Sequence, residues 1–257
     1  MRLLPTLVAG ALLAAAPAPA HAADKLTVLL DWFVNPDHGP LIVAEELGLY
    51  KQQGLDVELI APADPNDPPK LVAAGKADVA ISYQPQLHLQ VDQGLPLVRF
   101  GTLVATPLNT LTVLADGPVK SLADLKGRKV GFSVAGTEEA MLTAMLRTAG
   151  LGMADIELVN VNFSLSPSLI SGQVDAVIGA YRNFELNQMD IVGRPGRAFY
   201  VEEHGVPPFD QLIYVAHKDH AVDPRLPRFL AATERAVQFM VNHPDDAWAL
   251  FVKNHKE

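Results

Sequence analysis

The stretch LVAAGKADVAI at residues 71–81 is repeated in pattern, as LISGQVDAVI, at residues 169–178. Each stretch reads as a helix end, a glycine suited to the left-handed backbone that ends many helices, an aspartate and a short apolar strand. The two glycines lie about 97 residues apart, which is too far for the stacked units of a solenoid. We interpret the stretches as the same corner in each of two α/β lobes. The alternative is a coincidence between two ordinary helix–glycine–strand corners.

The chain before the first corner alternates between strand and helix patterns. Residues 26–30 form an apolar run rich in strand formers, and Pro40 opens an amphipathic helix that is predicted to continue to Tyr50. Residues 55–60 then alternate as a strand does. The order strand, loop, helix, strand favours an open α/β sheet.

The second corner is preceded by a strand and a helix of its own. Residues 129–133 read as the strand, Thr137 as a helix N-cap, and residues 140–148 as the helix. Residues 111–114 and 212–216 are strand-like, flank this region and are interpreted as the crossings between lobes. Lobe two is therefore expected to be inserted into lobe one. The predicted divisions are a signal peptide at 1–22, the first part of lobe one at 23–110, lobe two at 111–215 and the return to lobe one at 216–257.

The N-terminus has the pattern of a cleaved secretory signal. Arg2 supplies one positive charge, residues 3–16 are apolar, and residues 20–22 read Ala-His-Ala, the small-x-small pattern of a cleavage site. The apolar run is shorter than the roughly 20 residues that span a bilayer, which argues against the alternative of an uncleaved anchor. The sequence predicts a periplasmic protein.

Composition excludes several classes of function. Among 257 residues, 20 are Lys or Arg and 29 are Asp or Glu, so the chain is acidic and poorly suited to bind the phosphates of nucleic acids. The chain contains no cysteine, which excludes disulfides, thiolate metal sites, a thiol nucleophile and a lipid anchor on cysteine.

The sequence shows no catalytic signature. It lacks the HExxH, GxSxG, Walker and dinucleotide-binding patterns. His217 and His220 form the one loose histidine pair, at a strand end where solvated loop histidines are the expected interpretation. We therefore predict a protein that is not an enzyme and that has no metal and no cofactor.

Aromatic side chains follow three of the predicted strands. Trp32 comes directly after the first strand, and Tyr83 and Tyr181 occupy matching places after the two repeated corners. Because strand ends from both lobes face a common cleft in such folds, the three rings are predicted to hold a flat heterocycle by stacking. Each ring alone is equally consistent with capping the end of a sheet.

An acidic side chain is the second element of the predicted site. Glu185 lies four residues after Tyr181, so a helix places both on one face, where a carboxylate can accept hydrogen bonds from an aminopyrimidine. The alternative, a solvated glutamate at a helix start, is open for Glu185 and for Glu138. The remaining candidate ligand-binding residues, all polar or glycine positions at the same expected cleft edge, are Asn35, His38, Gln84 and Gly136.

Four stretches together resemble a known family. They are LDWFVNPDHGP at residues 30–40, GLDV at 54–57, SYQP at 82–85 and GAYRNFE at 179–185. They are similar to the periplasmic binding proteins for thiamine pyrimidine precursors, over nearly all of the chain after residue 22. The resemblance implies a type II periplasmic-binding-protein fold, α/β in class, with a hinge and a ligand cleft between two lobes.

The resemblance also implies a ligand and a partner. The ligand of the family is typically a formylated aminomethylpyrimidine, and the partner is an ABC permease at the inner membrane that a monomeric binding protein serves. Trp32, Tyr83 and Tyr181 would stack on the ring, and Glu185 would anchor the pyrimidine.

Two other functions remain to be weighed. The same superfamily contains a fungal synthase of the thiamine pyrimidine, whose CCCFC segment corresponds to Val-Pro-Pro-Phe-Asp at residues 206–210 and whose pyridoxal-binding lysine has no counterpart at residues 82–84. A binding protein for sulfonate, nitrate or a riboflavin-like compound is the other alternative. Anion binding needs a basic side chain or a helix N-terminus that points into the cleft, and Arg182 is the one basic residue beside the predicted site.

The chain departs from the family at its C-terminal end. Relatives continue for several more helices, whereas this sequence stops at Glu257, close to the helix expected at residues 244–253. The resemblance therefore predicts that part of lobe one is missing from this sequence and that apolar surface is left exposed there.

Overall fold

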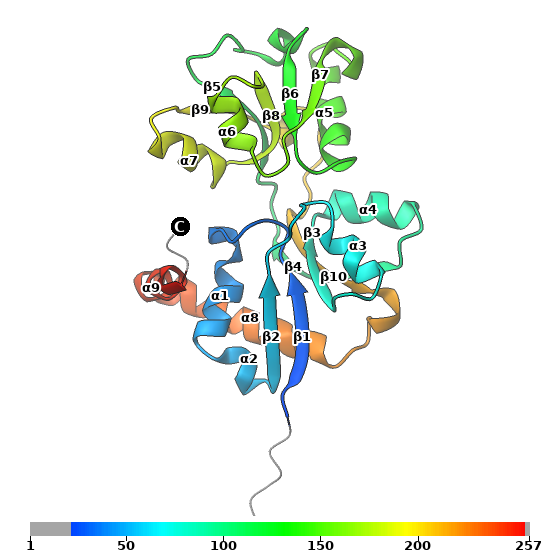
Figure 1. Cartoon of the computed structure of the whole chain (residues 1–257), viewed down its shortest axis with the longest axis vertical. Coiled ribbons are helices and arrows are strands. Elements are labelled where there is room, and N and C mark those ends of the chain that lie inside the picture. Colours follow the sequence, from blue (N-terminus) through cyan, green and yellow to red (C-terminus); the bar gives the residue numbers. More distant parts are fainter. Residues whose placement is uncertain (1–21, 255–257) are drawn as a thin grey trace, which may run out of the picture.

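The computed structural model describes residues 22–254 and contains two lobes, each built on a five-stranded sheet (Figure 1). The strand order is β2-β1-β3-β10-β4 in the first sheet and β7-β6-β8-β5-β9 in the second. The two orders correspond position by position, and the fourth strand of each, β10 or β5, runs antiparallel to both of its neighbours. The predicted two-lobed α/β fold is confirmed. The predicted signal peptide lies outside the described residues except for its last residue.

The first lobe contains both ends of the described chain (Figure 1). Its strands are β1 (Asp24–Leu29), β2 (Leu55–Ile60), β3 (Val79–Ser82), β4 (Leu97–Val104) and β10 (Leu212–His217). Its helices are α1 (Gly39–Glu46), α2 (Leu49–Gln52), α3 (Pro68–Ala73), α4 (Gln84–Asp92), α8 (Arg225–Asn242) and α9 (Pro244–Asn254), with 3-10 turns η1 (Pro36–His38) and η5 (Lys218–His220).

The second lobe lies between β4 and β10 in the chain. Its strands are β5 (Asn109–Leu114), β6 (Lys129–Phe132), β7 (Glu157–Asn160), β8 (Ala176–Tyr181) and β9 (Gly196–Tyr200). Its helices are α5 (Thr137–Thr148), α6 (Leu165–Ile170) and α7 (Glu185–Ile191), with 3-10 turns η2 (Leu122–Leu125), η3 (Met153–Asp155) and η4 (Val201–Glu203).

The repeated corner has the same structure in both lobes. The glycines after α3 and α6 adopt the left-handed conformation, with φ of 68° and 75°. The aspartate that follows then fixes the neighbouring strand: Asp78 accepts a hydrogen bond from the N–H of Thr27 at 2.8 Å, and Asp175 accepts one from the N–H of Lys129 at 3.0 Å. β3 and β8, which these corners begin, are the third strands of their sheets. The predicted equivalence of the corners is confirmed.

Two segments connect the lobes, one between β4 and β5 and the other between η4 and β10 (Figure 1). A side-chain amide joins them: Gln211 Oε1 accepts hydrogen bonds from the N–H groups of Leu108 at 2.8 Å and Asn109 at 3.1 Å. The sequence placed the return to lobe one after residue 215. Because all of β10 pairs within the first sheet, the structure places the return before Leu212.

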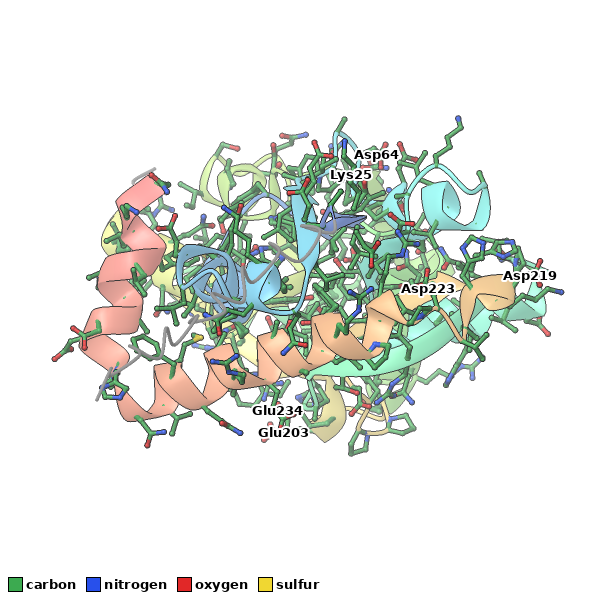
Figure 2. The ribbon with its side chains drawn as sticks, turned by 90° about the horizontal axis from the view of Figure 1, so that it is seen from below. Lys25, Asp64, Glu203, Asp219, Asp223 and Glu234 are labelled. Atoms are coloured by element: carbon green, nitrogen blue, oxygen red, sulfur yellow. The ribbon has the colours of Figure 1, made fainter. Side chains whose placement is uncertain are left out.

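The core of the first lobe lies between its sheet and α8. Figure 2, seen from below, shows α8 running along this lobe, with α9 turning away at its end. Phe229 of α8 stacks on Tyr50 at 5.5 Å between ring centroids and contacts Tyr214 of β10 edge to face at 5.3 Å. Tyr214 and Phe229 are fully buried, and aromatic pairs of this kind add about 0.5–1.5 kcal/mol each beyond the burial of their area.

Two local predictions were wrong. The helix expected from Pro40 to Tyr50 is interrupted at Gly48, whose φ of 66° ends α1 and allows α2 to start in a new direction. Thr137 is the first residue of α5 rather than its N-cap, because Gly136 takes the cap position with φ of 80°. The Thr137 hydroxyl therefore makes no capping hydrogen bond.

Across residues 22–254, none of the helices combines the length and the apolar character that crossing a membrane requires.

Candidate functional site

A pocket lies between the lobes, where the carboxyl ends of β1, β3, β6 and β8 approach one another. The empty space along its lining, open solvent included, is about 430 Å³. Ligands of open α/β sheets bind outside the carboxyl ends of strands. The lining residues come from both lobes and are Asp31, Trp32, Asn35, Tyr83, Asn109, Val134, Thr137, Glu138, Leu165, Gly179, Tyr181, Phe184 and Glu185.

The three aromatic side chains singled out in the sequence share this pocket. Trp32 and Tyr83 enter it from the first lobe and Tyr181 from the second. The tyrosine hydroxyls are held in place, since Tyr83 donates to Asp31 Oδ2 at 3.0 Å and Tyr181 accepts from Gln211 Nε2 at 3.1 Å. Rings fixed in this way lose little conformational freedom when a flat ligand stacks on them.

Trp32 is fixed by the opposite lobe. Its indole contacts Phe163 edge to face, with 4.6 Å between ring centroids, and only 7% of the residue is exposed. Its Nε1–H is buried and has no hydrogen-bond partner among the described residues. Because an unpaired buried donor costs free energy, this N–H is a suitable donor to an oxygen or nitrogen of a ligand.

Asp31 organises the pocket wall of the first lobe. His38 Nδ1 accepts a hydrogen bond from the N–H of Asn35 at 3.3 Å, so its Nε2 carries the proton and donates to Asp31 Oδ1 at 2.9 Å. The other oxygen of Asp31 accepts from Tyr83. Both oxygens are thus used inside the protein, and His38, which is fully buried, supports the loop from behind.

Two buried carboxyl groups face the pocket. Glu138 is 4% exposed and accepts a hydrogen bond from the N–H of Ser133 at 2.7 Å; Glu185 is 5% exposed and accepts one from the N–H of Tyr181 at 2.6 Å. Burial raises the pKa of Glu138 to about 8 and the pKa of Glu185 to about 7. Near neutral pH the two groups can therefore donate a proton in a hydrogen bond as well as accept one.

The pocket lining contains no Lys, Arg or His side chain. Arg182, the basic group that the sequence offered for anion binding, forms a two-pronged ion pair with Glu202 at 2.8 and 2.9 Å. Its guanidinium also lies 4.0 Å from the ring centre of Tyr200. Arg182 is therefore committed to η4 and β9, outside the pocket lining.

The structure brings most of the predicted site residues together. Those that line the pocket are Trp32, Asn35, Tyr83, Glu138, Tyr181 and Glu185. Three others lie outside the lining. His38 stands behind Asp31, Gln84 accepts a hydrogen bond from the N–H of Asp210 at 2.7 Å near the hinge, and Gly136 starts α5 at a neighbouring cavity. Each of these three residues has a structural role that the sequence did not predict.

Some lining residues were not predicted as ligand contacts. Asp31 begins the quoted DWFVNPDH segment, and its place directly after a buried strand was a usable signal. Gly179, in the middle of β8, has φ of 100°, which no sequence pattern announces. Asn109 and Thr137 reach the pocket through the packing of distant segments.

Direct contacts between the lobes flank the pocket. Asn66, in the loop before α3, accepts a hydrogen bond from the N–H of Ala135 at 2.9 Å and donates to the carbonyl oxygen of Ser133 at 3.1 Å. On another edge, Asn183 donates to Asp37 Oδ1 at 2.6 Å. These contacts join the two lobes directly.

The histidine pair noted in the sequence lies away from the pocket. The rings of His217 and His220 are 5.7 Å apart, and His217 Nδ1 accepts a hydrogen bond from the N–H of Asp219. Within residues 22–254, no cluster of three or more His, Cys, Asp or Glu side chains is arranged to hold a metal ion.

The chain is similar to proteins of thiamine metabolism. It is 54% identical over 234 residues to a thiamine biosynthesis protein of Haemophilus influenzae, covering 91% of this chain and 74% of the relative. It is 34% identical over 239 residues to the formylaminopyrimidine-binding protein of Halalkalibacterium halodurans, covering 92% and 72%. It is also 25% identical over 247 residues to the 4-amino-5-hydroxymethyl-2-methylpyrimidine phosphate synthase of Schizosaccharomyces pombe, covering 92% and 71%.

Two solved structures with a similar fold are named as binding proteins. The alkanesulfonate-binding protein of Xanthomonas axonopodis pv. citri gives a TM-score of 0.71 at 15% identity, over 89% of this chain and 78% of that one. The periplasmic aliphatic sulphonate binding protein of Escherichia coli gives 0.70 at 18%, over 90% and 78%. These likenesses show the two-lobed fold of periplasmic binding proteins.

A family model assigns the sequence directly. The model described as NMT1/THI5 like matches residues 35–247, which include the DWFVNPDH segment from Asn35 onward and both repeated corners. The match extends over both lobes and every part of the pocket except Asp31 and Trp32. The chain belongs to the NMT1/THI5 like family.

Proposed function

We propose that this protein is the substrate-binding component of an ABC importer and that its ligand is an aminopyrimidine precursor of thiamine, similar to formylaminopyrimidine. One observation carries the proposal: aromatic rings from both lobes and two buried carboxyl groups line a single pocket without a basic side chain. A relative named as a formylaminopyrimidine-binding protein supports the choice of ligand.

The pocket suits the hydrogen-bonding edge of an aminopyrimidine. Such a ring offers an exocyclic amine, which donates, beside a ring nitrogen, which accepts when neutral and donates when protonated. The Glu185 carboxyl matches this edge in either protonation state, because burial places its pKa near 7. The Trp32 Nε1–H can donate to a formyl oxygen, while Tyr83 and Tyr181 supply faces for stacking.

The other candidate functions have less support. An oxyanion such as a sulfonate or nitrate would meet three buried carboxyl groups, those of Asp31, Glu138 and Glu185, and no cation in the lining. A synthase would resemble the Schizosaccharomyces pombe relative, but residues 206–210 read Val-Pro-Pro-Phe-Asp and the chain has no cysteine. We infer a binding protein rather than an enzyme.

Titration calorimetry with formylaminopyrimidine tests the proposal. The protein without residues 1–22 should bind one equivalent with micromolar or tighter affinity. Alkanesulfonate, nitrate and riboflavin serve as competing ligands in the same cell. The absence of heat with the pyrimidine, together with tight binding of one of these, would overturn the proposal.

Removing a ring or the acid should weaken this binding. Trp32→Ala loses stacking area and Glu185→Ala loses a charge-assisted or acid–base hydrogen-bonded pair, so each should cost about 1–2 kcal/mol, or about 5- to 30-fold in Kd. Matched controls are Trp248→Ala and Glu203→Ala, which change exposed residues of α9 and η4. Equal affinity in wild type and both site variants would contradict the assignment of these residues.

The lobe-to-lobe contact of Asn66 should contribute to affinity without touching the ligand. Asn66→Ala removes two hydrogen bonds that join the lobes. Separated lobes should then become more populated, and Kd should rise about 5- to 30-fold. In the absence of ligand, small-angle X-ray scattering should show a larger radius of gyration for Asn66→Ala than for wild type. Asn242→Ala is the control, since Asn242 bonds Gln238 on its own helix; a Kd for Asn66→Ala equal to that of this control would refute the role.

Export and partnership complete the proposal. The signal-like residues 1–22 would direct the chain to the periplasm, where a monomer delivers its ligand to a permease of the inner membrane. N-terminal sequencing of the protein from a periplasmic extract checks this, and a mature chain that begins at residue 23 is expected. Recovery of the full chain from the cytoplasm would refute it.

A further inference from the structure

The turn between β6 and α5 has the form of an anion-binding site. A strand leads through residues 133–136 into the N-terminus of a 12-residue helix, and the start of that helix lines the pocket through Thr137 and Glu138. Backbone N–H groups in such a turn, together with the helix dipole, commonly bind a phosphate or another anion. We call this position in the turn the anion seat.

In this protein the seat is filled by the chain itself. Glu138 folds back so that its carboxyl group accepts a hydrogen bond from the N–H of Ser133 at 2.7 Å. The next N–H, that of Ala135, donates to Asn66 Oδ1 at 2.9 Å. Two donors of the turn, the N–H groups of Ser133 and Ala135, are therefore already satisfied by side-chain oxygens.

The opposite strand is shaped to receive this carboxyl group. A Cβ atom on Gly179 of β8 would lie 2.2 Å from Glu138 Oε1 and 2.6 Å from its Cδ, so a side chain at this position would collide with the acid. Gly179 also has φ of 100°, a backbone conformation that favours glycine. The Glu138 carboxyl is thus enclosed between a turn that donates to it and a strand that leaves it room.

The surroundings of the turn also disfavour an anionic ligand group. The lining contains the acids Asp31, Glu138 and Glu185 and no basic side chain, and Arg182 is paired with Glu202. A phosphate group brought into this pocket would have to displace Glu138 or lie beside it without a counter-charge. Either arrangement carries a large desolvation cost.

We propose that Glu138 is a specificity-determining residue that occupies the anion seat at the start of α5 and restricts the pocket to unphosphorylated pyrimidines. This inference rests on the proposed function for its ligand class. It adds a discrimination that matters, because relatives of this chain are named as synthases of a pyrimidine phosphate. It also implies that a phosphatase-type reaction must act on any phosphorylated precursor before this protein can capture it.

The test compares one alcohol with its phosphate ester. Calorimetry at constant ionic strength measures 4-amino-5-hydroxymethyl-2-methylpyrimidine and its monophosphate against wild type, Glu138→Ala, Glu138→Gln and Glu139→Ala. Wild type should prefer the alcohol by about 100-fold or more. Glu138→Ala frees the N–H of Ser133 and empties the space beside Gly179, so the preference should shift toward the phosphate by about tenfold or more.

The other two variants separate occupancy from charge. Glu138→Gln keeps an oxygen in the seat, so the phosphate should still be rejected by about tenfold or more. Glu139→Ala removes one negative charge from the same helix turn without opening the seat, and it should keep the preference of wild type. The inference is overturned if wild type binds both compounds equally, if Glu138→Ala leaves the preference unchanged, or if Glu139→Ala shifts it as much.

A separate readout does not depend on the pyrimidine. Thermal unfolding of each variant is followed with and without inorganic phosphate, with chloride at equal ionic strength as reference. Glu138→Ala should be stabilised by phosphate while wild type is not, even if neither protein binds the pyrimidine. If Glu138→Ala does not fold, Glu138→Ser takes its place; absence of phosphate stabilisation in the folded variant counts against the seat.

Discussion

Gly179→Ala should unfold at markedly lower denaturant concentration and should lose ligand binding. The φ of 100° at this position is strained for any side chain, and the new Cβ would lie 2.2 Å from a buried oxygen of Glu138. Backbone strain and the displaced carboxyl group should together cost on the order of 3 kcal/mol in the free energy of unfolding. Denaturant titration and calorimetry on the same sample measure the two effects.

A second glycine isolates the backbone contribution. Gly172 also has a positive φ, 75°, but a Cβ there meets nothing within 4 Å, so Gly172→Ala should cost only about 1 kcal/mol and spare the pocket. The double variant Gly179→Ala/Glu138→Ala removes the collision and should be less destabilised than the sum of its single variants. Equal losses for Gly179→Ala and Gly172→Ala would contradict the collision.

The ligand-free protein should become less stable as pH rises from about 4.5 to about 8. Burial raises the pKa of Glu138 to about 8 and that of Glu185 to about 7, whereas both titrate near the ordinary value of 4.5 when unfolded. Between these values the folded state holds protons that the unfolded state has lost, so the free energy of unfolding falls with pH. At about 1.4 kcal/mol per pKa unit, the contribution across each window is on the order of 5 kcal/mol for Glu138 and on the order of 3 kcal/mol for Glu185.

The measurement compares stability profiles rather than single values. Denaturant titrations from pH 4.5 to 8.5 are made on wild type and on Glu138→Gln/Glu185→Gln, in which neither position titrates. Subtracting the two profiles removes the contributions of other groups. The slope of wild type should be the steeper one, and parallel profiles would show that neither carboxyl group retains its proton on folding.

The fold was predictable because the two lobes repeat a local solution. Each lobe needs a glycine that ends a helix and an aspartate that accepts a hydrogen bond from the N–H of the neighbouring strand. The same sequence pattern therefore occurs at residues 71–81 and 169–178. The matching strand orders of the sheets follow from that repetition. Positions of Trp32, Tyr83 and Tyr181 at strand ends were sufficient to bring them to one pocket.

The parts that could not be predicted depend on partners distant in the chain. His38 looked like a ligand contact, but its ring is used by Asp31 and Asn35 and never reaches the lining. Gln84 instead accepts a hydrogen bond from the N–H of Asp210, which lies 126 residues away in the chain. Such competition for a polar side chain is decided by tertiary packing, and a single sequence carries no local trace of it.

The amide of Gln211 links the hinge to the binding pocket. Its oxygen accepts hydrogen bonds from the N–H groups of Leu108 and Asn109 at the start of β5, and its nitrogen donates one to the hydroxyl of Tyr181. A rotation of one lobe about these connecting segments would therefore also move the ring of Tyr181 away from a bound ligand. In the proposed import function, separation of the lobes and release of the ligand would then be a single movement that needs no separate trigger.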